Sequence, residues 1–201
     1  MARAPLTFRR LVGLDRSGPA PPQTLHDAPW NPWTIPNAIS FVRLGLIPVF
    51  LVLALTSDEG TDTLPAIIFA AVGWGDYADG IAARVTGQYS KLGALLDPVI
   101  DRLLVLSGVV VVWHFETLPR WALAVLAVRE VVQILYAQHA LRRGVDLTVN
   151  WPGRAAVWPV MSAIFAALVG WETFGEWLLY LGIVLSLWAT ALYIQEGSSS
   201  T

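Results

Sequence analysis

Four aspartates lie within a stretch that is otherwise apolar enough to form two membrane-spanning helices: Asp76, Asp79, Asp97 and Asp101. A single carboxylate at the centre of a bilayer costs roughly 2.5–3.5 kcal/mol, so four of them need partners that offset their charge. Carboxylate oxygens are hard ligands that suit Mg²⁺ or Mn²⁺, and a pair of such ions is a common means of moving a phosphoryl group. The residue types therefore indicate a site for two divalent ions.

The spacing of these residues predicts two helix faces. The first set recurs at i, i+3, i+4, i+7 and i+8, which is one face of a helix: Asp76, Asp79, Gly80, Ala83 and Arg84. The second set recurs at intervals of four and forms a stripe on another helix: Gly93, Asp97 and Asp101. Two facing helices can thus bring four carboxylates to one point. The missing side chains at Gly80 and Gly93 either let a nucleotide diphosphate approach the backbone or permit tight helix packing.

The two stripes together resemble the signature of the CDP-alcohol phosphatidyltransferases: Asp76-x-x-Asp79-Gly80-x-x-Ala83-Arg84, eight residues, then Gly93-x-x-x-Asp97-x-x-x-Asp101. Residues 34–43 resemble the start of the family's first membrane helix, and the resemblance covers residues 33–195. It implies that the metal ligands are Asp76, Asp79, Asp97 and Asp101, with Asp101 near the second ion as the general base. It also implies a CDP site lined by Asp79, Gly80, Ala83, Arg84 and Gly93.

The activity implied by this resemblance is transfer of a phosphatidyl group from CDP-diacylglycerol to a hydroxyl acceptor, with release of CMP. Residues 95–102 resemble phosphatidylglycerophosphate synthases, which use glycerol 3-phosphate, and this acceptor is placed first. The same segment resembles relatives that make cardiolipin from phosphatidylglycerol, and members that use inositol phosphate share most of the motif. A homodimer is expected, and a nucleic-acid partner is not. If the protein is not an enzyme, the alternative is a divalent-metal transporter. The clustering of the aspartates at one membrane interface argues against an ion path across the membrane.

Arginines are the candidate ligands for an anionic acceptor. Arg43 and Arg129 fall inside predicted spans, where a cation needs a partner, although Arg129 could instead form a structural pair with Glu130 or Asp101. Arg154 occupies a position similar to the lysine of the family segment that helps to bind the acceptor phosphate. Arg142 and Arg154 could equally be determinants of membrane orientation.

Composition predicts an all-α, polytopic membrane protein. The chain is 55% hydrophobic and 14% charged with a mean hydropathy of +0.56, against about 25% charged residues in soluble domains. Apolar runs predict six transmembrane helices at residues 38–56, 64–84, 92–113, 118–141, 154–170 and 176–195. We expect a cytoplasmic tail at 1–32, with a basic amphipathic segment at 3–12 that either lies on the membrane or is solvated. The membrane domain then covers 33–196, and 197–201 is a flexible C-terminus.

Charges in the connections predict the orientation. Basic residues gather in the N-terminal tail, at 84–91 and at 141–154, whereas the alternate connections are acidic apart from Arg120. The positive-inside rule therefore places both termini and the aspartate motif on the cytoplasmic side of a bacterial inner or cell membrane.

Overall fold

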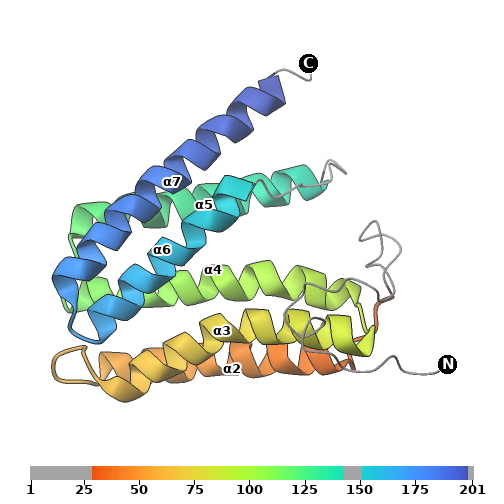
Figure 1. The fold of residues 1–201 in the computed structure, drawn as a ribbon, viewed down its shortest axis with the longest axis horizontal. Coiled ribbons are helices and arrows are strands. Elements are labelled where there is room, and N and C mark those ends of the chain that lie inside the picture. Colours follow the sequence, from red (N-terminus) through yellow and green to blue (C-terminus); the bar gives the residue numbers. More distant parts are fainter. Residues whose placement is uncertain (1–28, 143–150, 199–201) are drawn as a thin grey trace. The chain divides into compact units, whose positions relative to one another are not determined.

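The computed structural model describes residues 29–142 and 151–198, which form six helices and no strand (Figure 1). The helices are α2 (Ile35–Leu55), α3 (Thr63–Thr86), α4 (Lys91–His114), α5 (Arg120–Arg142), α6 (Trp151–Leu168) and α7 (Glu172–Ser198). Each overlaps one predicted span, and the ends differ by up to four residues. The all-helical class is therefore confirmed. The amphipathic segment predicted at 3–12 lies outside the described residues.

Side-chain caps decide where the helices of the site begin. Thr34 precedes α2, and its hydroxyl accepts a hydrogen bond from the backbone N–H of Asn37 at 3.2 Å. Ser90 precedes α4 in the same way, since its hydroxyl accepts from the N–H of Gly93 at 2.9 Å. Both contacts satisfy a donor that has no partner within its own helix. The turn between α3 and α4 includes Gly87, whose φ of 67° is easily adopted only without a Cβ.

The chain divides into two compact units. Of the described residues, the first contains 29–49 and 70–104, and in it the adjoining parts of α2, α3 and α4 are joined by side-chain hydrogen bonds. The second contains the described residues of 50–69 and from 105 onward, and its core includes the rings of Phe50 and Phe69, with centroids 5.3 Å apart. All residues of the aspartate motif belong to the first unit.

Within the second unit, α6 and α7 pack closely because small residues lie between them. A Cβ on Gly175 would lie 2.9 Å from the carbonyl oxygen of Ala163, and one on Gly182 would lie 2.6 Å from a methyl group of Val160. A Cβ on Gly108 of α4 would likewise lie 2.6 Å from a methyl group of Ile164. Such contacts through small residues are typical of helices that associate in a bilayer.

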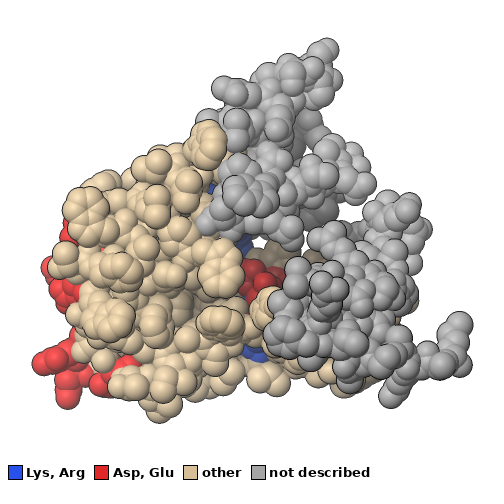
Figure 2. Space-filling view, viewed as in Figure 1, with Lys and Arg blue, Asp and Glu red and all other residues tan. Residues whose placement is uncertain are grey.

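One described helix is long and apolar enough to cross a membrane by length and composition, namely α2, with a mean hydropathy of 2.4. The segment Ala156–Leu168 is apolar but shorter. The aspartates of α3 and α4 lower the mean hydropathy of those two helices. Large apolar side chains are exposed on all six helices, among them Val52, Ile67, Val110, Val128, Trp158 and Val184. Uncharged side chains cover most of the coloured face in Figure 2.

Candidate active site

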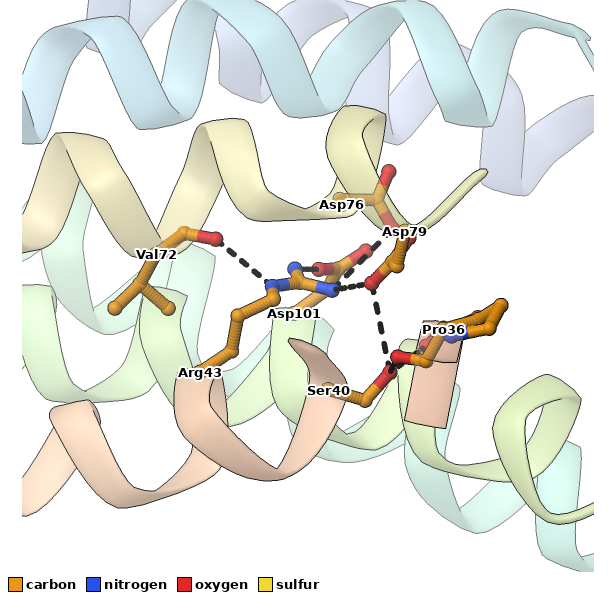
Figure 3. A network of polar contacts seen from close by, with 8 residues as sticks. Pro36, Ser40, Arg43, Val72, Asp76, Asp79 and Asp101 are labelled. Carbon is orange, nitrogen blue, oxygen red and sulfur yellow. Dashed lines mark hydrogen bonds and ion pairs between the residues drawn. The ribbon is translucent and has the colours of Figure 1, made fainter. Parts of the chain in front are cut away.

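One buried arginine lies among the aspartates of the motif (Figure 3). Arg43 of α2 donates from Nη1 to Oδ2 of Asp79 and from Nη2 to Oδ1 of Asp101, each at 2.8 Å. Its Nη1 also lies 3.6 Å from Oδ1 of Asp76. The side chain of Asp79 is only 6% exposed, whereas those of Asp101 and Asp76 are 37% and 52% exposed. The motif thus combines one enclosed carboxylate with two that a ligand can reach.

The fourth aspartate of the motif is bound by a serine of α2. Ser40 Oγ lies 3.1 Å from Oδ1 of Asp97 and 3.5 Å from Oδ2 of Asp79. Because a hydroxyl has one proton, it donates to one of these oxygens at a time. Ser40 is 1% exposed, so it connects an aspartate of α4 with one of α3 away from solvent. The structure therefore brings the two predicted stripes together, with α2 contacting both.

A second buried residue of α2 fixes the start of α4. Asn37 is fully buried, and its Nδ2 donates to the carbonyl oxygens of Asn31 and Pro32, each at 3.0 Å. Its Oδ1 accepts from the hydroxyl of Ser90 at 2.7 Å. A Cβ on Gly93 would lie 2.6 Å from that same Oδ1. The absence of a side chain at Gly93 is thus required by helix packing, which is one of the two explanations that the sequence left open.

The remaining residues assigned to CDP lie on α3. Gly80 is half-buried, and a Cβ there would meet only Nη2 of Arg84, at 3.8 Å. Arg84 is exposed and donates from Nε to the carbonyl oxygen of Gly80 at 3.0 Å. Ala83 is half-buried. A Cβ on Gly80 would thus be in ordinary contact with one side-chain atom, whereas a Cβ on Gly93 would overlap Asn37, and the contact of Gly80 with a nucleotide stays a prediction.

The arginines predicted to bind the acceptor are in different surroundings. Arg43 contacts the aspartates, as described above. Arg129 belongs to the second unit, is 8% exposed and forms an ion pair with its neighbour Glu130, which is one of the structural pairs that the sequence left open. Arg142 ends α5 and Arg154 lies in the first turn of α6, but their side chains lie outside the described residues. The acceptor role of all four stays a prediction.

The aspartates suit divalent ions by their chemistry. Within residues 29–142 and 151–198, no three acidic or histidine side chains stand ready to surround a metal ion. Oxygens of Asp79 and Asp101 contact the guanidinium of Arg43 instead. One guanidinium beside four carboxylates leaves an excess of negative charge, and carboxylate oxygens are the ligands that Mg²⁺ and Mn²⁺ prefer. The donor set therefore fits these ions.

Several residues that shape this site have no role predicted from the sequence. Asn37 and Ser40 lie in the segment 34–43 that resembles the start of the family's first membrane helix, whereas Gly75 and Ser90 belong to no motif position. A local signal exists for α2, because Asn37, Ser40 and Arg43 follow one another at intervals of three in an apolar helix. Such spacing places polar side chains near one face. Nothing local identifies Gly75 or Ser90, whose contacts are with another helix.

Comparison with known proteins identifies the family of this chain. The family model described as CDP-alcohol phosphatidyltransferase matches residues 33–188, a range that contains α2 to α6 and the larger part of α7. The chain belongs to the CDP-alcohol phosphatidyltransferase family. The matched range begins just before the cap of α2, so it includes Asn37, Ser40 and Arg43 as well as the aspartates.

Named relatives in this family fall into two groups. A cardiolipin synthase (CMP-forming) of Streptomyces coelicolor is 36% identical over 181 residues, covering 81% of this chain and 82% of the relative. A CDP-diacylglycerol–glycerol-3-phosphate 3-phosphatidyltransferase of Bacillus subtilis is 27% identical, covering 68% of this chain and 77% of the relative. An enzyme of the same name from Pectobacterium atrosepticum is 29% identical, covering 81% of this chain and 93% of the relative.

The two glycines of the motif are expected to respond differently to alanine. Gly93→Ala should lower the free energy of unfolding by about 1–3 kcal/mol, because the new methyl group overlaps an asparagine that is fixed by buried hydrogen bonds. Gly80→Ala should leave stability unchanged or raise it by up to about 1 kcal/mol through helix propensity. Thermal unfolding in detergent measures both changes. Equal destabilisation by the two substitutions would contradict this difference.

Proposed function

We propose that this CDP-alcohol phosphatidyltransferase transfers the phosphatidyl group of CDP-diacylglycerol to phosphatidylglycerol, forming cardiolipin and releasing CMP. The observation that supports catalysis at this site is the meeting of Asp76, Asp79, Asp97 and Asp101 beside Arg43. The choice of acceptor is supported by the relatives, since the cardiolipin synthase is 36% identical and the two glycerol-3-phosphate enzymes are 27% and 29% identical. Glycerol 3-phosphate is the second candidate acceptor, and the similarity to those two enzymes supports it.

The four aspartates would hold two divalent ions, Mg²⁺ or Mn²⁺, whose charge would offset that of the donor pyrophosphate and of the departing CMP. Arg84 is exposed on the same helix as Asp76 and Asp79, and its guanidinium would bind phosphate oxygens of the nucleotide. The missing side chain at Gly80, beside which a Cβ would meet only the guanidinium of Arg84 among the described residues, would let the nucleotide approach the α3 backbone. These features support a CDP site along α3.

Asp101 is the proposed general base. Its side chain is 37% exposed, so a bound alcohol can reach it, whereas Asp79 is enclosed. In the reaction, Asp101 takes the proton of the acceptor hydroxyl as that oxygen bonds to the phosphorus next to diacylglycerol. The phosphorus–oxygen bond to CMP breaks, and CMP leaves with the electron pair.

We further propose that all six helices span a bacterial cell membrane with the motif near its cytoplasmic side. Large apolar side chains that are exposed on every helix support this, because an exposed apolar surface of this extent is typical of contact with lipid or with another protein. A membrane location suits two substrates that both bear acyl chains. The homodimer stays a prediction.

The choice of acceptor can be tested with purified protein and CDP-diacylglycerol. Phosphatidylglycerol is expected to support CMP release and to yield cardiolipin, while glycerol 3-phosphate and inositol phosphate support little. The measurements are CMP by chromatography and the lipid product by mass spectrometry. Asp101→Asn is the matched control, expected to lower turnover by roughly 10²–10⁴-fold, as loss of a general base does. Release of CMP with glycerol 3-phosphate alone would make the second candidate the function.

Metal dependence predicts that excess chelator abolishes CMP release and that Mg²⁺ or Mn²⁺ restores it. Asp76→Asn should shift the restoring metal concentration upward, because one charged ligand is lost. Asp58→Asn, in the exposed connection after α2, is the control for the loss of an acidic side chain elsewhere and should behave as wild type. The metal titration of CMP release measures the shift. Full activity in excess chelator would exclude the two-metal proposal.

Orientation in the membrane can be tested directly because the chain contains no cysteine. Thr86→Cys, at the exposed end of α3, should be protected from an impermeant thiol reagent in intact cells and should react after lysis. Asp62→Cys, in the connection between α2 and α3, should react in intact cells. The positive-inside rule gives this pattern. The reverse labelling would place the motif on the outer side, where CDP-diacylglycerol is not made.

A further inference from the structure

Arg43 is the charged residue on which the aspartate motif converges, and its burial is nearly complete. Its side chain is 2% exposed, although it belongs to the most apolar of the described helices. A cation in such surroundings persists only when its donors are satisfied by charged or polar partners. The contacts of Arg43 are therefore constraints on the site as well as on the fold.

The guanidinium of Arg43 uses three of its nitrogens on three separate acceptors (Figure 3). Nε donates to the carbonyl oxygen of Val72 at 2.9 Å, while Nη1 and Nη2 bind Asp79 and Asp101. A planar fork with fixed donor directions cannot make these contacts in several orientations. Arg43 thus joins α2 to α3 through two bonds and to α4 through one.

The chain provides a space for the stem of this arginine. A Cβ on Gly75 of α3 would lie 2.6 Å from Cδ and 2.8 Å from Cγ of Arg43, distances that real side chains do not show. By contrast, a Cβ on Gly45 of α2 would have no neighbour within 4 Å. Gly75 is therefore required for Arg43 to lie where it does, and it lies next to Asp76, the first aspartate of the motif.

We propose that Arg43 is an internal counter-ion that competes with divalent cations for Asp79 and Asp101. This inference rests on the metal-dependent function proposed above. The carboxylate oxygens that would bind a metal ion are the ones that Arg43 contacts, and a positive charge about 3 Å away disfavours a second cation there. Arg43 is thus a positioning residue that keeps the carboxylates together before metal and donor arrive. Binding of the ions then requires the guanidinium to give up at least one of these two contacts.

The test measures Mn²⁺ binding and thermal stability, independently of turnover. Chelator-treated protein in detergent is titrated with Mn²⁺, and the free ion is followed by electron paramagnetic resonance. Arg43→Gln should bind Mn²⁺ about tenfold more tightly than wild type, a coupling of ordinary size between two competing ligands. In chelator its melting temperature should fall, and Mn²⁺ should raise that temperature by more than it does in wild type.

Three further variants separate charge from packing. Arg43→Lys keeps the charge, so its Mn²⁺ affinity should stay within about threefold of wild type. Gly75→Ala keeps Arg43 but displaces its stem, and it should tighten Mn²⁺ binding in the same direction as Arg43→Gln. Gly45→Ala, where a methyl group meets no neighbour, should match wild type in both measurements. If Arg43→Gln does not fold, Gly75→Ala provides the same comparison.

Two outcomes are distinguishable failures. In the first, wild type binds Mn²⁺, and Arg43→Gln and Gly75→Ala bind it no more tightly than wild type does. That result would show that Arg43 serves packing alone, and it would overturn the counter-ion proposal. Absence of Mn²⁺ and Mg²⁺ binding to active wild-type protein would instead contradict the metal-dependent function on which the proposal rests.

Discussion

The arrangement of α2, α3 and α4 in the first unit depends on one buried cation. Arg43 is enclosed, and each of its bonds ends on an acceptor from a different turn or helix. Removing one partner of a buried ion pair typically costs about 3–5 kcal/mol, because the other charge is left without compensation. Neither the arginine nor Asp79 can therefore change without affecting the other. The same interaction that stabilises the helices also sets the positions of the carboxylates.

Uncharged polar residues give this charged group a rigid support. Asn37 and Ser90 connect the start of α2 with the start of α4, and Ser40 links the carboxylates of Asp79 and Asp97. Buried hydrogen bonds of this kind specify one arrangement of the helices, because alternatives would leave buried polar groups without partners. Reactive groups need supports of this precision, since small errors in position lower the rate of a group transfer.

The surroundings of the motif also suit the proposed lipid substrates. The charged groups lie in the same helices as exposed apolar side chains, so in the proposed membrane location a lipid would keep its acyl chains in the bilayer while its phosphate reached the aspartates. Phosphatidylglycerol and CDP-diacylglycerol both have this division between chain and headgroup. A site of this type has no need to extract either lipid completely from the membrane. Which groups contact the headgroup of the acceptor stays a prediction for Arg43, Arg129, Arg142 and Arg154.

The sequence by itself determined the all-helical class, the six helices and the common face of each aspartate stripe. These features are local, because they follow from runs of apolar residues and from the 3.6-residue period of a helix. Only the tertiary structure decided which partner the aspartates take, since Arg43 is 36 residues from Asp79 and 58 from Asp101. It also decided that Gly93 is required by packing against Asn37, whereas a Cβ on Gly80 would make only an ordinary contact with Arg84. Spacing along one helix fixes the direction of a side chain, but the group that it meets depends on how separate helices pack.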